Sequence, residues 1–195
     1  MELTHEEVGL FSPWKREVRE LYERAFPDVE RLPFGMLLVN ALRGCVRLEV
    51  HVLGGSLAAI TYSVESDEGL YLLYLAVSDE MRGRGVGSEV LAEMRRRAGS
   101  RPLALDVEPP YADAPNAEQR RRRMAFYRRA GVTSTGRCLI DDEGTYLVLS
   151  TQPDISSERL RQIVGKLAPM SYRPRIVDAA EAGVPEGDEA RGQGR

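Results

Sequence analysis

The stretch "MRGRGVGS", residues 81–88, combines two residue types that suit an anionic ligand. Glycine has no Cβ, so backbone N–H groups at glycines can converge on a phosphate, and arginine side chains add positive charge around it. A helical pattern follows, and the N-terminus of a helix adds a partial positive charge. The residues that could take part are Arg82, Gly83, Arg84, Gly85, Gly87 and Ser88. Together they predict a site for a phosphate or diphosphate group.

Three types of phosphate-binding loop can be compared by their spacing. A P-loop requires Lys followed by Ser or Thr after its last glycine, and "GSE" stands there instead, which excludes it. A dinucleotide-binding loop is approximated by Gly83, Gly85 and Ser88, with Asp106 near the expected position. However, "SDEMR" separates the preceding strand from Gly83, where that loop should follow its strand almost at once. The third type, R-x-x-G-x-G between a strand and a helix, fits the spacing best.

The segments before this loop indicate two helices and an antiparallel meander. Apolar residues at helical spacing predict helices over residues 14–26 and 33–42. Strict alternation in "VRLEVHV" predicts a half-buried strand at 46–52, with Arg47, Glu49 and His51 on its polar face. Further strands are predicted at 56–64 and 70–77. Since the last of these is apolar on both faces, it should be central in the sheet.

The segments after the loop predict one strand-helix-strand-helix unit and a closing hairpin. Val86, Val90, Leu91 and Met94 share one face of a helix, and "PLALDVE" at 102–108 follows as a strand. A helix ending in "MAFYRRAGV" comes next, then strands at 136–140 and 145–150 and a short helix at 157–167. The predicted fold class is therefore α/β of the α+β type: a mixed sheet with helices on both sides.

Length and composition favour one soluble globular domain. The chain has 195 residues, of which 43% are hydrophobic and 29% charged, and it should form a domain over residues 1–168. Beyond Pro169 large apolar residues become rare, so residues 169–195 are expected to be a disordered tail. The start "MELTHEEVGL" lacks the order of a signal peptide, and no apolar run approaches roughly 18 residues. We expect a cytoplasmic protein with no membrane partner.

Charge and cysteine usage exclude or disfavour two further classes of function. The net charge of -3 disfavours nucleic acid as a partner, although "EQRRRRMAFYRR" keeps a basic-helix nucleic-acid binder as an alternative. We interpret those arginines as ion-paired or solvated. Cys45 and Cys138 lie far apart and should be reduced, and with only two histidines the chain has too few ligands for a zinc site.

The order of these parts resembles the GCN5-related N-acetyltransferases (the GNAT family), whose R/Q-x-x-G-x-G/A signature receives the pyrophosphate of coenzyme A. The resemblance covers residues 48–150 and includes the central strand ending in "LAV", the glycine loop, the strand "LALDVE", and "FYRRAGV", which is similar to the FY-x-x-x-GF ending of the family. It implies the GNAT acyl-CoA N-acyltransferase fold and a V-shaped opening between the central strand and the next, in which acetyl-CoA lies.

The resemblance also implies which residues hold acetyl-CoA. The backbone of Leu75 and Val77 would hold the acetyl carbonyl and the pantetheine arm. The backbone amides of Gly83, Gly85, Gly87 and Ser88 would hold the pyrophosphate, with Arg82 and Arg84 adding charge. No metal is implied.

For catalysis the resemblance implies direct attack by a primary amine in a ternary complex. Because an amine with a pKa near about 10.4 is mostly protonated, one group must remove a proton and another must supply one to the departing thiolate. Tyr127 is similar to the tyrosine that donates to the sulfur of coenzyme A, and Glu108 is the candidate base, directly or through a water. The Leu75 N–H would stabilise the developing oxyanion.

Other interpretations stay open at this point. A non-catalytic acyl-CoA-binding or regulatory domain would keep the loop and lack the chemistry. The chain departs from the family at its N-terminus, where no first strand is evident, and at Arg120, where many relatives have an asparagine. The acceptor amine cannot be named, and a homodimer is compatible with the sequence without being required by it.

Overall fold

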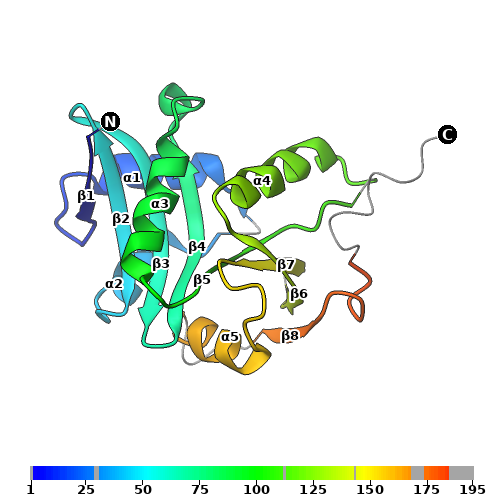
Figure 1. Ribbon diagram of the computed structural model, residues 1–195. Coiled ribbons are helices and arrows are strands. Elements are labelled where there is room, and N and C mark those ends of the chain that lie inside the picture. Colours follow the sequence, from blue (N-terminus) through cyan, green and yellow to red (C-terminus); the bar gives the residue numbers. More distant parts are fainter. Residues whose placement is uncertain (1, 29–30, 112, 143, 168–173, 185–195) are drawn as a thin grey trace.

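The computed structural model describes residues 2–28, 31–111, 113–142, 144–167 and 174–184 of the chain. These residues form an eight-stranded mixed sheet with the order β1-β2-β3-β4-β5-β7-β6-β8. β4 and β5 run parallel, and the other neighbouring strands are antiparallel. The predicted fold class, a mixed sheet with helices on both sides, is confirmed (Figure 1).

The helices and strands occur in the predicted order, and the structure contains two further strands that were not predicted. The first half contains β1 (Leu3–Glu7), α1 (Lys15–Ala25), α2 (Phe34–Ala41), β2 (Val46–Leu53), β3 (Ser56–Ser66) and β4 (Gly69–Val77). The second half contains the 3₁₀ turn η2 (Asp79–Met81), α3 (Val86–Ala98), β5 (Leu103–Val107), α4 (Ala117–Arg129), β6 (Thr133–Ile140), β7 (Thr145–Ser150), α5 (Ser157–Val164) and β8 (Arg175–Asp178).

Two hydrophobic cores lie on opposite faces of the sheet. Apolar residues of α1, α2 and α5 pack on one face, around Tyr71 and Tyr74 of β4. Residues of α3 and α4 pack on the other face, around Leu70 and Leu72. Figure 1 shows α3 crossing the front of β2–β4 while α1 lies behind them. β4 is therefore covered on both sides, as expected for a central strand.

β4 contains a bulge, and its pairing with β5 ends beside it. Tyr62 and Ser63 of β3 pair with Tyr74 and Leu72, so Leu73 is the extra residue on β4. The parallel pairing with β5 stops at Leu72 and Leu105. Because a bulge bends a strand and increases its twist, it accounts for β4 turning away from β5 at this point. The two strands diverge toward the carboxyl end of β4.

Two strands of the structure, β1 and β8, were not predicted from the sequence. β1 was not evident in "LTHEE", yet it pairs antiparallel with β2. Disorder was predicted from residue 169 onward, and this is wrong for residues 175–178, which form β8 on the edge of β6. Backbone pairing to a neighbouring strand, together with burial of Ile176, stabilises this short segment. Residues 168–173 and 185–195 lie outside the described part of the chain.

Glu49 and His51, on the predicted polar face of β2, are buried, contrary to the predicted half-buried strand, while Arg47 on the same face is partly exposed. Glu49 and His51 are each 2% exposed, because α3 covers this face of the sheet. Arg97 of α3 donates two hydrogen bonds to the Glu49 carboxylate, at 2.8 and 2.9 Å, and a third of 3.3 Å to Ser63 Oγ. Arg97 Nε also lies 3.7 Å from Glu65. The helix and the sheet are therefore joined by a buried ion pair.

His51 is held as a neutral side chain beside this pair. Its Nε2 lies 3.0 Å from the Thr61 hydroxyl, and its Nδ1 has no hydrogen-bond partner among the described residues. Burial, with smaller contributions from His5 and Arg97, lowers the pKa of His51 to about 4 from 6.5. As the pH falls, His51 therefore binds a proton in the unfolded chain at a higher pH than in the folded chain.

This difference predicts that stability falls at acid pH. The contribution of His51 is present above pH 6.5 and is lost as the pH falls toward about 4, because the unfolded state binds the proton first. The loss should reach about 3 kcal/mol. Urea unfolding of the wild type and of His51→Gln across this range should show a shallower pH dependence in the variant. Equal slopes would contradict the lowered pKa.

Candidate functional site

The glycine loop takes a conformation that most residue types avoid. Gly83 and Gly85 have φ values of 74° and 82°, in the left-handed region where a Cβ is strained. Gly85 is the residue that caps the start of α3. The first N–H groups of an α-helix have no acceptor within the helix, so the amides that follow Gly85 are available to a ligand. The loop therefore presents backbone donors to a ligand.

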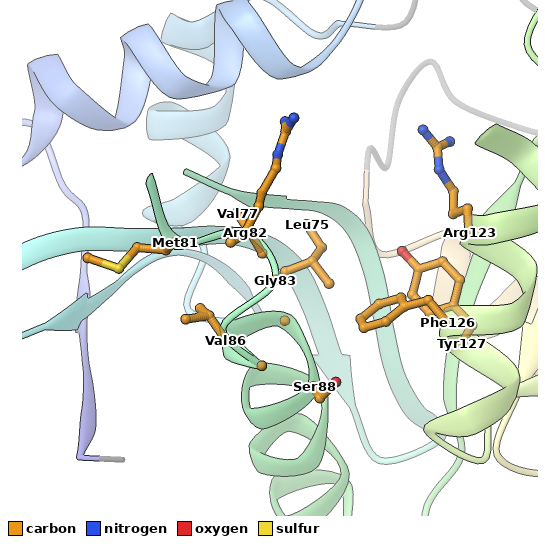
Figure 2. Close-up of a pocket in the computed structure, with 12 residues that line it drawn as sticks. Leu75, Val77, Met81, Arg82, Gly83, Val86, Ser88, Arg123, Phe126 and Tyr127 are labelled. Carbon is orange, nitrogen blue, oxygen red and sulfur yellow. The ribbon is translucent and has the colours of Figure 1, made fainter. Parts of the chain in front are cut away.

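The loop lines a cavity of about 350 Å³ that lies between the end of β4 and the helices α3 and α4. Its lining residues are Leu75, Val77, Met81, Arg82, Gly83, Gly85, Val86, Gly87, Ser88, Arg123, Phe126 and Tyr127. Figure 2 shows Phe126 and Tyr127 on the α4 wall, facing Ser88 and Leu75 across the opening. The predicted cofactor-binding residues, apart from Arg84, thus share one cavity with the predicted acid Tyr127.

Gly87 fixes the width of this cavity. A Cβ at this position would lie 3.2 Å from Phe126 Cζ, closer than an ordinary contact, and 3.4 Å from Val77 Cγ2. A larger side chain would push α3 away from the α4 wall or fill the space between them. The glycine therefore serves close packing here, in contrast to the backbone conformations of Gly83 and Gly85.

The side chains of Arg82 and Arg84 have different contacts, and only Arg82 lines the cavity. Arg82 lines the cavity, its side chain is 65% exposed, and it forms an ion pair of 3.0 Å with Asp79. Arg84 Nη1 instead contacts Met81 Sδ at 3.2 Å, and Arg84 is not part of the lining. A direct role for Arg84 would require its side chain to turn.

Tyr127 keeps its proton throughout the neutral range. Burial raises its pKa to about 12, with a further increase from the charge of Asp106 and a decrease from Arg123. Its ring packs against Phe126 with a centroid distance of 5.1 Å. A protonated hydroxyl at the wall of the cavity can donate to a group bound there.

Glu108 lies outside the cavity lining and is held by three side chains. Arg120 forms a short hydrogen-bonded ion pair with one carboxylate oxygen. Asn116 donates to the other at 3.4 Å, and Arg123 Nη1 lies 3.7 Å from it. Both oxygens therefore have donors. The base role predicted for Glu108 remains a prediction, and it would require one of these contacts to open.

Four residues of the lining were not predicted from the sequence: Met81, Val86, Arg123 and Phe126. Arg123 could have been found, because it lies four residues before Tyr127 and so shares its helix face. The three arginines that precede Arg123 form ion pairs. Arg121 and Arg122 each lie 2.9 Å from Glu118, and Arg120 bonds Glu108. Arg121 and Arg122 thus form ion pairs on the surface, Arg120 pairs with Glu108, and Arg123 lies in the wall of the site.

Comparison with known proteins identifies the family. The family model described as acetyltransferase (GNAT) family matches residues 4–132, about two thirds of the chain. The chain belongs to the GNAT family. This GNAT chain is also 35% identical over 65 residues to YjbC of Bacillus subtilis (strain 168), a protein named as an acetyltransferase. That match spans 33% of this chain and 31% of the length of the relative.

Solved structures support the GNAT fold over most of the chain. A protein of Bacteroides thetaiotaomicron, described as a GNAT-family acetyltransferase, superposes with a TM-score of 0.64 at 20% identity and covers 87% of this chain and 98% of its own. A Bacillus subtilis acetyltransferase in complex with CoA superposes with a TM-score of 0.52 at 11% identity, covering 76% and 97%. At these identities the likeness shows the fold alone.

The described residues contain no group of three or more His, Cys, Asp or Glu side chains arranged to hold a metal ion. In the same part of this GNAT chain, Cys45 and Cys138 are free, and burial raises the pKa of the Cys138 thiol to about 11. A thiol with a raised pKa is a weak nucleophile at neutral pH. None of the described helices has the length and apolar character that crossing a membrane requires.

Proposed function

We propose that this GNAT chain transfers the acetyl group of acetyl-CoA to a primary amine by direct attack in a ternary complex. The observation that carries the proposal is the cavity itself. It joins the backbone donors of Gly83, Gly85 and Gly87 at one end to the Tyr127 hydroxyl at the other. A ligand with a diphosphate at one end and a reacting sulfur at the other matches this arrangement.

The residues present fit acetyl-CoA. The left-handed backbone at Gly83 and Gly85 and the start of α3 provide the donors that a pyrophosphate needs. Arg82 adds positive charge at the same end. Leu75 and Val77 lie beyond the last pair between β4 and β5, so backbone groups on that edge of β4 are available to the pantetheine arm.

Each chemical step is assigned to a residue of this chain. Tyr127 donates its hydroxyl proton to the departing sulfur, which its raised pKa permits because the hydroxyl stays protonated at neutral pH. The N–H of Leu75 stabilises the negative charge that develops on the acetyl oxygen. A carboxylate at the end of β5 receives a proton from the amine, and Glu108 is the residue predicted from the sequence.

Thermal unfolding with acetyl-CoA tests the proposal without knowledge of the acceptor. Acetyl-CoA at about 100 times its dissociation constant should stabilise the fold by roughly 2.7 kcal/mol, which is a measurable shift in Tm. Free coenzyme A should act similarly, since the loop contacts are shared. NAD should have no effect.

The controls separate the alternatives. A shift with NAD alone would favour the dinucleotide interpretation of the loop, and no shift with any of the three would remove the proposal. A shift with acetyl-CoA but no release of free thiol in the presence of any primary amine would favour a non-catalytic acyl-CoA-binding domain.

A further inference from the structure

The cavity beside the glycine loop carries positive charge on two opposite walls. The described residues that line it include two arginines, Arg82 and Arg123, and no aspartate or glutamate. Arg82 comes from the segment before α3 and Arg123 from α4, and Figure 2 shows them on the two sides of the opening. Their side chains are 65% and 39% exposed. A ligand held by the glycine loop therefore faces a second cation across the cavity.

Each of these arginines contacts a carboxylate that lies outside the lining. Arg82 Nη1 lies 3.0 Å from Asp79 Oδ1, and Arg123 Nη1 lies 3.7 Å from Glu108 Oε2. The first pair is exposed to solvent, and the second is longer than a hydrogen bond. Ion pairs of these kinds contribute little to stability. Both guanidinium groups can therefore leave their carboxylates at small cost.

Each carboxylate also keeps another cation when its arginine leaves. Arg24 of α1 lies 3.3 Å from Asp79 Oδ2, and Arg120 forms an ion pair with Glu108 Oε1. A carboxylate that loses its only cation inside a protein is costly, but neither of these two would be left without one. The two lining arginines are thus able to exchange these partners for an anionic ligand.

We propose that Arg82 and Arg123 bind the diphosphate of acetyl-CoA from opposite walls of the cavity, each exchanging its carboxylate for a phosphate oxygen. This inference rests on the proposed function. The glycine loop supplies backbone donors, and the two guanidinium groups supply full positive charges in a planar geometry that suits phosphate oxygens. Because Arg123 stands one helical turn before Tyr127, the same contact holds the α4 wall against the ligand that Tyr127 must reach.

A competing role for Arg123 follows from its position on α4. Burial raises the pKa of Tyr127, and the charge of Arg123 opposes that increase. If Arg123 served only to adjust the tyrosine, its loss would slow the chemical step and leave the affinity for acetyl-CoA unchanged. Loss of a diphosphate contact would instead weaken binding in the absence of any acceptor. Binding and turnover measured separately therefore distinguish the two roles.

The test measures dissociation constants from the dependence of Tm on ligand concentration. The ligands are acetyl-CoA and acetyl-dephospho-CoA, which keeps the diphosphate and lacks the 3′-phosphate. The variants are Arg82→Gln, Arg123→Gln and the double variant. Arg122→Gln is the matched control, since Arg122 is adjacent to Arg123, 79% exposed and paired with Glu118 at 2.9 Å. The Tm of each variant without ligand shows whether the fold is intact.

Arg123→Gln should raise the Kd of both ligands about tenfold, because both carry the diphosphate. The difference from the wild type should shrink as the salt concentration rises, and the double variant should bind more weakly than either single variant. Arg122→Gln should bind like the wild type. Asp79→Asn should bind more tightly than the wild type, since Arg82 then has no carboxylate to leave.

Four results would count against these assignments. Equal Kd values for Arg123→Gln and Arg122→Gln would overturn the inference, and so would a loss confined to acetyl-CoA, which would place Arg123 at the 3′-phosphate. Slower thiol release with n-butylamine as acceptor, at an unchanged Kd, would assign Arg123 to the chemical step instead. Weaker binding in Asp79→Asn would overturn the exchange of partners. A wild type that binds neither ligand would overturn the proposed function as well.

Discussion

Replacing Tyr127 with phenylalanine should lower kcat by about 10²-fold or more while leaving the affinity for acetyl-CoA close to that of the wild type. The variant keeps the ring that packs against Phe126 and removes only the hydroxyl at the cavity wall. Because the pKa of Tyr127 is about 12, the hydroxyl carries a proton at neutral pH that the thiolate requires on departure. Thiol release with an amine acceptor gives kcat, and the Tm shift with acetyl-CoA reports binding.

Tyr62→Phe is the matched control, since it also removes a buried hydroxyl, on β3 and away from the cavity lining. Its kcat should remain close to that of the wild type. If Tyr127→Phe behaves like this control, the tyrosine only packs in the wall and another group supplies the proton. A loss of the acetyl-CoA shift in Tyr127→Phe would instead indicate that the hydroxyl contributes to binding.

Arg97→Ala should destabilise the fold by about 3–5 kcal/mol, because it leaves the Glu49 carboxylate buried without its cation. Glu49 is 2% exposed and receives two hydrogen bonds from Arg97, whose own side chain is 22% exposed. Urea unfolding at neutral pH measures the change in the free energy of unfolding.

Arg96→Ala is the control for this prediction. Arg96 is adjacent in the sequence, its side chain is 64% exposed, and it lies 3.6 Å from Glu89, so its removal should cost less than about 1 kcal/mol. The double variant Arg97→Leu/Glu49→Leu should recover much of the loss, since a buried ion pair replaced by apolar groups is often neutral. A loss in Arg97→Ala no greater than that in Arg96→Ala would show that Glu49 finds another partner.

Local patterns in the sequence were sufficient for most of the fold. The helices and the strands β2 to β7 follow periodic or continuous apolar patterns, and their order indicated the mixed sheet. β1 and β8 were missed because a five-residue strand with one apolar residue and a strand of only four residues carry almost no pattern. Their stability comes from pairing with the edges of β2 and β6, which lie far away in the sequence.

The residues of the site likewise differ in whether local sequence patterns could predict them. The glycine loop could be predicted because its function depends on the backbone, and glycine spacing reveals backbone conformation directly. The environments of Glu49 and Glu108 could not be predicted, since their partners Arg97 and Arg120 lie 48 and 12 residues away and meet them only in the folded chain. A carboxylate that looks exposed in the sequence can thus be fully engaged in the structure.

The bulge at Leu73 also bears on the balance between stability and activity. Without the extra residue, β4 would run straight, and its hydrogen-bonding edge could pair with β5 beyond Leu72. Such a sheet would satisfy more of its own backbone groups, and the donors at Leu75 and Val77 would no longer be free for a ligand. Under the proposed function, the incomplete pairing between β4 and β5 therefore gives up part of the possible stability of the sheet and leaves room for the pantetheine arm beside β4.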